Sequence, residues 1–443
     1  MNARSHRLEN GLDINGEPMA KNIGFISTRF AGTDGVSLEA SKWAHVLTEA
    51  GHRCFWLAGE LERDPEVSWL LPEAHFKHEK NQWINARVFG HKNRKAGVTD
   101  TIHAVKVLIK VAIEEFIEHF RIDMLIVENA LTIPMHIPLG VALTEIIAER
   151  QIPTIAHHHD FHWERARFSV NAVDDYLRMA FPPKLNSLAH VVINSAGQEE
   201  LALRTGASAI IIPNVLDFDH EVQSDPVQSA LFRKTVGLKP EDKIILQPTR
   251  IVQRKGIEHA IELVKHLEDP AYKLVISHEA GDEGFEYAEW LKSHAREHGV
   301  DLRLFDMQVA DPFNGGGRRN GPYTLWDIYP HADFITYPSL YEGFGNAFLE
   351  AIYFRKPLLV NRYAIFVRDI EPKGFDLVVM DGFLTEKNLQ NVRQVLESTE
   401  RRERMVTHNF NIARRYYSYS VLRHALNMLV FHFFGVEGGA HQC

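Results

Sequence analysis

Two glutamates, Glu342 and Glu350, are separated by a short glycine-rich stretch in the second half of the chain. Gly343 and Gly345 let the main chain come close to a ligand, and the N–H groups of a helix that starts near Asn346 favour an anion or a hydroxyl-rich group. Glu350 then lies about 6 Å further along the helix axis. We therefore expect the two carboxylates to hold different parts of one elongated ligand. The alternative is an ordinary strand-to-helix turn with two solvent-exposed glutamates.

A second candidate for ligand binding is the basic segment 247–257, in which Arg250 and Lys255 are five positions apart. Arginine offers a planar fork of donors and lysine a mobile point charge, so both can neutralise a diphosphate. Arg254 is a third cation in the same segment. The alternative is a basic loop that only faces solvent.

A third candidate is a cluster of four histidines, His157, His158, His159 and His162, within six positions. Imidazoles next to the Asp160 carboxylate can bind a metal, but successive residues rarely point the same way, and no cysteine accompanies them. We expect no metal here. Buried histidines paired with other side chains remain the broader alternative.

The segment 27–36 links the first predicted strand to the first predicted helix and contains Gly32, Asp34 and Gly35. It lacks the complete G-x-G-x-x-G pattern, so it gives no case for a dinucleotide cofactor. A tight turn and a ligand-binding loop both remain open for this segment.

The candidate segments follow predicted strands, and short β-rich runs alternate with amphipathic runs along the whole chain, which is typical of parallel sheets covered by helices. The predicted strands are 22–27, 53–58, 122–127, 152–157, 190–194, 209–212, 243–248, 272–277, 302–305, 333–337 and 357–360. The main predicted helices are 36–50, 257–267, 285–298, 346–353, 386–397, 400–416 and 420–434. Ligands bind such folds at the carboxyl ends of the strands, where these candidates fall.

The length of 443 residues exceeds what one hydrophobic core usually serves, so two domains are expected. Between 217 and 240 the apolar density drops, and we place the domain boundary there. The predicted parts are a flexible arm 1–20, a Rossmann-like domain 21–215, a linker 216–240, a second Rossmann-like domain 241–418 and a helix 419–443 that crosses back to the first domain.

The composition narrows the classes of function. With 49 Lys and Arg against 58 Asp and Glu, the net charge of −9 does not favour a nucleic-acid partner. Only Cys54 and Cys443 are present, which argues against a disulfide framework and favours the cytoplasm. No apolar stretch approaches the ~18 residues of a membrane span, so stable membrane insertion is not expected. A homo-oligomer is compatible with the sequence.

Taken together, the segments resemble the family 4 retaining glycosyltransferases, which have the GT-B fold of two doubly wound Rossmann-like α/β domains facing each other across a cleft. Glu342 to Gly345 with Glu350 matches the core of the E-x7-E motif of that family, and Arg250 with Lys255 matches its R-x4-K element. The likeness extends from Gly32 to Glu350. Two departures are the absence of the usual double glycine after Gly32 and of a glycine after Asn214.

The resemblance implies a role for each candidate. Catalytic roles are implied for Arg250, Lys255, Glu342 and His158, with His159 as the second choice for the active-site histidine. Donor contacts are implied for Gly32, Gly35, Gly343, Phe344, Gly345, Asn346, Glu350 and His278. Acceptor contacts are expected for Asp34, Asn129, His159, Asp160, Trp163 and Arg165. The domain 21–215 would then bind the acceptor and the domain 241–418 the donor.

The implied reaction transfers a hexose from a nucleotide diphosphate sugar, GDP-mannose or UDP-glucose, to a hydroxyl of a small sugar or sugar acid, with retained anomeric configuration. The segment 157–165 is similar to synthases of small glycosides such as mannosylglucosylglycerate. No cofactor and no essential metal are expected, because two cations can stabilise the leaving diphosphate. The alternatives are a GT-B sugar phosphorylase, a nucleotide-sugar epimerase or a noncatalytic nucleotide-sugar binding protein.

Overall fold

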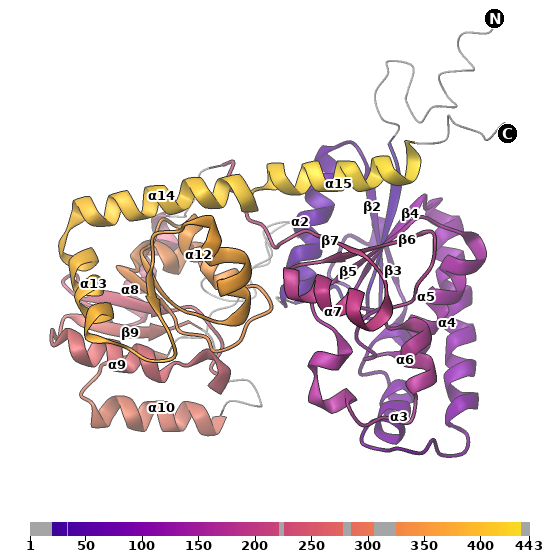
Figure 1. Ribbon diagram of the computed structural model, residues 1–443, viewed down its shortest axis with the longest axis horizontal. Coiled ribbons are helices and arrows are strands. Elements are labelled where there is room, and N and C mark those ends of the chain that lie inside the picture. The colour runs from indigo at the N-terminus through magenta and orange to yellow at the C-terminus, as the bar shows by residue number, and fades with distance from the viewer. Residues whose placement is uncertain (1–19, 33, 221–225, 278–284, 305–324, 436–443) are drawn as a thin grey trace, which may run out of the picture. The chain divides into compact units, whose positions relative to one another are not determined.

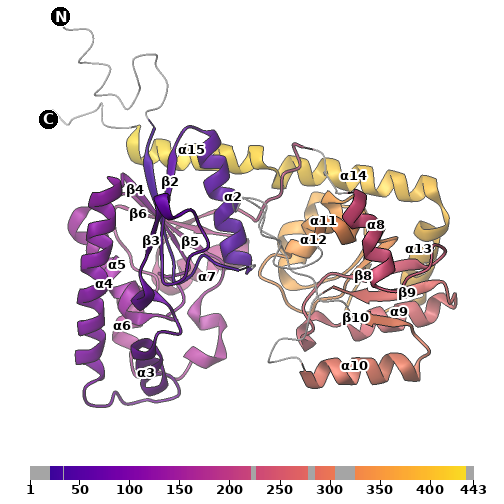
Figure 2. The same cartoon turned by 180° about the vertical axis from the view of Figure 1, so that it is seen from behind.

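The computed structural model describes residues 20–32, 34–220, 226–277, 285–304 and 325–435. They form two compact units. Unit 1 contains the described residues up to Pro213 and those from Ser420 onward, and unit 2 contains the described residues from Asn214 to Tyr419. Each unit is built around one parallel sheet, shown in Figures 1 and 2.

The sheet of unit 1 has seven parallel strands in the order β3-β2-β1-β4-β5-β6-β7. The strands are β1 (Asn22–Ile26), β2 (Arg53–Ala58), β3 (Ser68–Leu70), β4 (Met124–Glu128), β5 (Thr154–His158), β6 (Leu188–Val192) and β7 (Ala209–Ile211). The helices are α2 (Gly35–Glu49), α3 (Glu79–Val88), α4 (Val98–Phe120), α5 (Ile137–Arg150), α6 (Asp174–Ala180), α7 (Ser195–Thr205) and α15 (Tyr419–Phe434).

Helices cover both faces of this sheet, with α4 and α5 on one face and α2 on the other (Figure 1). The α4–α5 face buries apolar side chains at three- and four-residue steps, among them Ile109, Ile113 and Phe116 of α4 against Leu125 of β4. The central strands carry almost only apolar residues because both faces of a doubly wound sheet are buried.

The sheet of unit 2 has six parallel strands in the order β10-β9-β8-β11-β12-β13. The strands are β8 (Lys243–Gln247), β9 (Tyr272–Ile276), β10 (Leu302–Leu304), β11 (Phe334–Tyr337), β12 (Leu358–Asn361) and β13 (Val378–Met380). The helices are α8 (Pro226–Thr235), α9 (Glu258–Leu267), α10 (Phe285–Glu297), α11 (Leu325–Ile328), α12 (Asn346–Tyr353), α13 (Glu386–Glu397) and α14 (Thr399–Tyr417). One core joins β8, β9, β11 and β12 to α9, α10 and α13.

The predicted fold class, two Rossmann-like α/β domains, is confirmed, and the predicted strands recur within a few residues. The strands β3 and β13, of three residues each, were not predicted. The predicted linker 216–240 is not without regular structure. It contains α8, which belongs to unit 2, and Phe232, Val236 and Leu238 are buried there.

The chain ends were predicted to be an arm and a crossing helix. All but the last residue of the arm 1–20 lies outside the described residues. The helix α15 belongs to unit 1, where Arg423 Nη2 lies 2.5 Å from Glu49 Oε2 of α2. None of the helices in the described ranges is long and apolar enough to cross a membrane.

Candidate active site

Each sheet has a topological switch point, where the strand order reverses and the following loops diverge. In unit 1 the point lies between β1 and β4, and in unit 2 between β8 and β11. Ligands of open α/β folds bind outside the carboxyl ends of such strand pairs. The predicted cations and the loop of Glu342 follow β8 and β11, while Asp34 follows β1 and Asn129 follows β4. The sequence candidates therefore occupy both switch points.

In unit 2, Lys255 and Glu342 form a buried ion pair between Nζ and Oε1. Lys255 ends a single 3-10 turn (Gln253–Lys255) after β8, and Glu342 lies in the loop after β11. Arg254 joins them, with Nη1 3.3 Å from Glu342 Oε2 and 3.1 Å from the Tyr341 carbonyl oxygen. The structure thus brings together residues that are about ninety positions apart in the sequence.

Burial and the charge of the partner shift the pKa of each member of this pair in opposite directions. Burial raises the pKa of Glu342, but the Lys255 ammonium outweighs it and holds that pKa below its usual value. Burial lowers the pKa of Lys255, partly offset by Glu342, and the nearby Arg250 guanidinium lowers it further. The Glu342 carboxylate is therefore ionised at neutral pH, and Arg250 lies within electrostatic range of Lys255.

The backbone of the two loops is tightly fitted. The Leu340 N–H donates to the Arg254 carbonyl oxygen at 2.9 Å, and a side chain at Gly256 would place Cβ 2.6 Å from the Pro338 oxygen. Gly345 has φ +122°, and its Cβ would lie 2.6 Å from the Tyr363 hydroxyl. These positions require glycine, which keeps the loops against each other and opens the start of α12.

The other predicted donor residues have distinct surroundings. Arg250 is exposed, and Glu350 accepts a hydrogen bond at 3.0 Å from the buried Tyr329 hydroxyl. Asn346 Oδ1 accepts one from Asn214 Nδ2 at 2.7 Å. The Phe344 ring is buried and packs edge-on against that of Tyr417, so only its backbone could face a ligand.

The structure gives less detail for the last two residues predicted to contact the donor, Gly343 and His278. Gly343 is half-buried in the loop between Glu342 and Phe344. His278 lies outside the described residues.

In unit 1, Asp34 is the N-cap of α2. Its carboxylate accepts from the Val36 and Ser37 N–H groups at 3.1 and 3.2 Å and lies 2.9 Å from Arg29 Nη2. The structure gives this carboxylate a local role at the helix start, and its contact with an acceptor stays a prediction. The Gly32 N–H donates to Glu62 Oε2 at 2.9 Å, and Gly35 is the first residue of α2.

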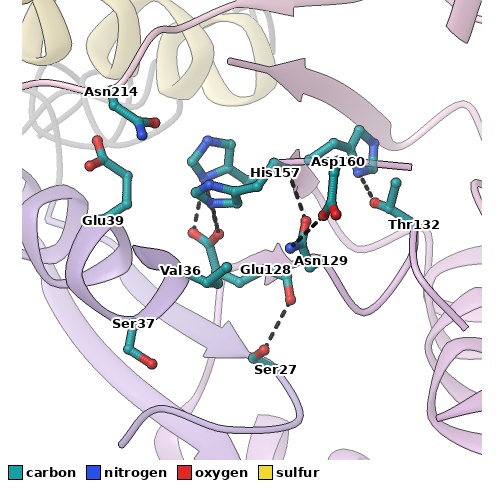
Figure 3. Close-up of polar contacts among 12 residues, drawn as sticks. Ser27, Val36, Ser37, Glu39, Glu128, Asn129, Thr132, His157, Asp160 and Asn214 are labelled. Atoms are coloured by element: carbon teal, nitrogen blue, oxygen red, sulfur yellow. Dashed lines mark hydrogen bonds and ion pairs between the residues drawn. The ribbon is translucent and has the colours of Figure 1, made fainter. Parts of the chain in front are cut away.

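His157 and His158 end β5, and His159 follows them. Their side chains alternate between two environments, because neighbouring side chains on a strand point to opposite faces. His157 and His159 both face Glu128, whose carboxylate lies 3.1 Å from His157 Nδ1 and 3.1 Å from His159 Nε2. Figure 3 shows the Glu128 carboxylate directed at the His157 imidazole. This carboxylate at the end of β4 was not among the predicted site residues.

His158, the predicted active-site histidine, faces the other way. Its ring is 1% exposed, Nδ1 is bonded to the Thr132 hydroxyl, and Nε2 lies 2.9 Å from His190 Nδ1. Burial lowers the pKa of His158 well below its usual value. With both ring nitrogens bonded inside unit 1, His158 is placed for structure, whereas His159 is only partly buried.

The remaining acceptor candidates divide into two groups. Asn129 Oδ1 accepts from the His159 N–H at 2.9 Å. The Asp160 carboxylate, which lies beside Asn129 in Figure 3, pairs with Arg165 Nε at 2.6 Å. Trp163 instead stacks on Phe161, with ring centroids 4.5 Å apart, in a small apolar cluster. Its ring packs within unit 1.

A metal ion has two conceivable positions among the described residues. In the first position, both His157 and His159 are hydrogen-bonded to the Glu128 carboxylate, so a proton lies between each ring and this carboxylate. At the end of α10, His294, Glu297 and the following His298 have ligand atoms within 4.8 Å of one another. Neither group adjoins the predicted donor residues in the sequence.

Glu128 carries a signal that sequence reasoning could have used. It is a single carboxylate at the end of an otherwise apolar strand, MLIVE, in a sheet buried on both faces. Such a charge needs a partner. The partner could not be chosen without the register, which pairs Glu128 with His157.

Known proteins resemble this chain in sequence and in fold. The profile described as glycosyl transferases group 1 matches residues 228–411. The mannosylglucosylglycerate synthase of Petrotoga mobilis is 32% identical, with 80% of this chain and 86% of that one covered. The synthase of the same name from Thermotoga maritima is 29% identical, with coverage of 91% and 98%.

Solved structures with the same fold include a glycosyltransferase from Rickettsia africae, with a TM-score of 0.67, 13% identity, and 94% and 98% of the two chains covered. HepE of Anabaena, in complex with UDP and glucose, has a TM-score of 0.59 and 12% identity, with coverage of 93% and 99%. The fold, the motif loops at the switch points and the synthase relatives lead to one conclusion. The chain belongs to the group 1 glycosyl transferases.

Proposed function

We propose that this glycosyltransferase transfers a hexose from a nucleotide diphosphate sugar to a hydroxyl of a small sugar or sugar acid, with retention of the anomeric configuration. The observation that carries the proposal is the Lys255–Glu342 pair with Arg250 at the switch point of the sheet in unit 2. It offers positive charge for a diphosphate and a carboxylate for sugar hydroxyls.

The charges fit the bond that must break. As the bond between the sugar C1 and the phosphate oxygen opens, positive character develops on the sugar and negative charge on the nucleotide. Arg250 and Lys255 would stabilise the departing diphosphate, and the start of α12 adds N–H donors. Glu342 would orient the sugar hydroxyls and Glu350 the ribose diol.

The same charges favour two finer features of the reaction. The acceptor hydroxyl would attack on the face that the nucleotide leaves, and its proton would pass to a phosphate oxygen of the donor. Two cations supply the electrostatic role of a divalent ion, so we propose a reaction without an essential metal. Transfer should then persist in excess EDTA.

The substrates follow from the relatives' names. Both synthases make mannosylglucosylglycerate by name, which points to a mannosyl donor and a glucosylglycerate acceptor. The HepE structures contain UDP or UDP-glucose, which keeps UDP-glucose as the competing donor. We propose a glycoside of glycerate as the acceptor class, with GDP-mannose as the first donor to test.

A screen of GDP-mannose and UDP-glucose against glucosylglycerate, glycerate and neutral disaccharides tests the proposal. We expect acceptor-dependent nucleotide release with one donor, and a product whose anomeric configuration by NMR equals that of the donor. An inverted product would exclude retention. A new sugar from donor alone, or sugar phosphate from glycoside and phosphate, would indicate an epimerase or a phosphorylase instead.

Replacing the proposed cations tests their role. Arg250→Ala removes an exposed side chain and should lower kcat/KM for the donor about 10- to 100-fold, the value of a hydrogen bond to a charged group. Arg250→Ala/Lys255→Ala should abolish transfer. The matched control, Lys387→Ala/Arg404→Ala, removes the same charge from exposed positions of α13 and α14. Equal activity of both double variants would remove Arg250 and Lys255 from the reaction.

A further inference from the structure

The Glu128 carboxylate is fully buried, and its partners are two imidazoles. His157 Nδ1 lies 3.0 Å from Oε2, and His159 Nε2 lies 3.1 Å from the same oxygen. The two rings are 4.4 Å apart, and His157 also stacks on Trp43 of α2 at 4.2 Å. A buried carboxylate without a compensating proton would be costly, so the group must hold positive charge as well.

The position of that proton follows from the surroundings of each ring. Burial lowers the pKa of His157, and the opposing effect of Glu128 does not restore it. For His159, burial also lowers the pKa, but the hydrogen bond and charge of Glu128, with Glu39 and Asp160, reverse the sign and raise it. The pKa of Glu128 is about 2, because the two histidines outweigh the effect of burial. These pKa directions, together with the buried Nε2 of His157 that has no hydrogen-bond partner among the described residues, place the proton on His159.

The charged groups around His159 come from three elements. Glu128 comes from β4, Glu39 from α2 and Asp160 from the loop after β5. Glu39 is ion-paired with Lys42 at 2.8 Å, and Asp160 with Arg165. Among these three carboxylates, Glu128 is the one whose ion pairs are with histidines.

We propose that Glu128 is a positioning residue that holds His159 as an imidazolium at the carboxyl edge of β4 and β5. Nε2 donates to Glu128, which leaves the Nδ1–H to donate to an oxygen of the substrate bound by unit 1. None of the described residues hydrogen-bonds His159 Nδ1. The inference rests on the proposed function and adds to it the protonation state of the active-site histidine.

The backbone also fixes the ring. The His159 N–H donates to Asn129 Oδ1, and Asn129, with φ +56°, donates its own N–H to the His157 carbonyl oxygen at 3.0 Å. Ser27 Oγ donates to the Glu128 carbonyl oxygen at 3.0 Å and so ties β4 to β1. Ser27 therefore holds Glu128, and Asn129 holds His159. A charged donor fixed in this way forms a stronger hydrogen bond than a neutral donor.

The decisive variant is Glu128→Gln, which keeps the shape of the side chain and removes its charge. A neutral His159 donates from one nitrogen only, so we expect kcat/KM for the acceptor to fall about 10- to 100-fold at pH 7.5. Activity should recover toward acid pH, where the medium protonates His159. The alkaline limb of the pH profile should move down by about one unit or more.

Two comparisons separate positioning from simple structural support. Glu128→Asp keeps the charge, so it should keep the alkaline limb near its wild-type position even if activity falls. In a His159→Asn background, Glu128→Gln should have little further effect on kcat/KM, because the group through which Glu128 acts is gone. Fully additive losses would overturn the proposal.

A measurement without turnover keeps the test independent of the proposed function. Histidine-labelled protein gives NMR signals, and that of His159 is identified by its absence in His159→Asn. We expect its titration midpoint above 6.5 in the wild type and below it in Glu128→Gln. If no donor and acceptor pair reacts, the proposed function fails while this titration still decides the role of Glu128.

Two results would overturn the inference. One is a His159 midpoint that Glu128→Gln leaves unchanged. The other is stoichiometric metal in the purified protein that is lost in both Glu128→Gln and His159→Asn, since Glu128 would then be a ligand of that metal.

Discussion

At the scale of residues, each unit buries a carboxylate beside positively charged side chains at the edge of its sheet. Lys255 and Arg254 neutralise Glu342 in unit 2, and His159 neutralises Glu128 in unit 1. A buried pair gains little over an apolar pair, yet removal of one member is costly. Such charges are therefore expected where a ligand needs them.

Glu342→Ala leaves the Lys255 ammonium buried without its main partner. We expect a loss of about 3 kcal/mol in the free energy of unfolding, together with a further fall in the pKa of Lys255. Urea denaturation measures the first quantity. Glu400→Ala, which removes a 91% exposed side chain of α14, is the control and should change stability by less than about 0.5 kcal/mol. Equal midpoints for both variants would contradict the buried pair.

At the scale of elements, glycines set how closely helices approach their neighbours. Gly140 lies inside α5, where a Cβ atom would come within 2.3 Å of the Phe181 ring. Helix propensity alone would favour alanine by about 1 kcal/mol. Overpacking of a filled core costs about 1 to 3 kcal/mol, so the contact with Phe181 is expected to decide the sign.

Gly140→Ala should therefore destabilise the protein by up to about 2 kcal/mol, despite the better helix former. Chemical denaturation would show this as a lower midpoint. The comparison is Gly197→Ala in α7, where the nearest atoms to the new Cβ lie at 3.3 Å and the expected change is smaller. A stabilised Gly140→Ala variant would show that Phe181 moves aside at little cost.

At the scale of the whole molecule, buried neutral histidines link stability to pH. The chain has 25 histidines, and burial lowers the pKa of His136 to about 3 and that of His190 to about 4. His136 caps α5, since Nδ1 accepts from the Leu139 N–H at 3.2 Å while Nε2 donates to the Glu73 carbonyl oxygen at 2.8 Å. Protonation of Nδ1 would remove that cap.

Stability should fall as the pH drops below about 6.5, because the unfolded chain then binds protons that the folded histidines refuse. His136 and His190 together should cost about 2 kcal/mol between pH 7 and 5.5. The raised pKa of His159 works in the other direction, since its contribution is lost as the pH rises. Thermal unfolding measured between pH 7 and 5.5 tests whether stability falls as the pH drops. His136→Asn keeps a capping side chain that does not titrate, and its dependence on pH should be flatter.

The sequence by itself determined the order of strands and helices and the loops that carry the candidates. The apolar runs of β8 and β11 and the helix at Asn346 follow from local patterns, so the position of Glu342 at a sheet edge could be predicted. The short strand β3 and the helix α8 were not predicted from local patterns.

Only the tertiary structure decided which side chains meet. The register of β4 with β5 pairs Glu128 with His157, and strand alternation then directs His159 to the same carboxylate and His158 away from it. Likewise, Arg254 reaches Glu342 because the loops after β8 and β11 lie together at the switch point. Local propensity fixes where a strand lies along the chain, but contacts between distant strands depend on packing of the whole sheet, and no short stretch of sequence contains that information.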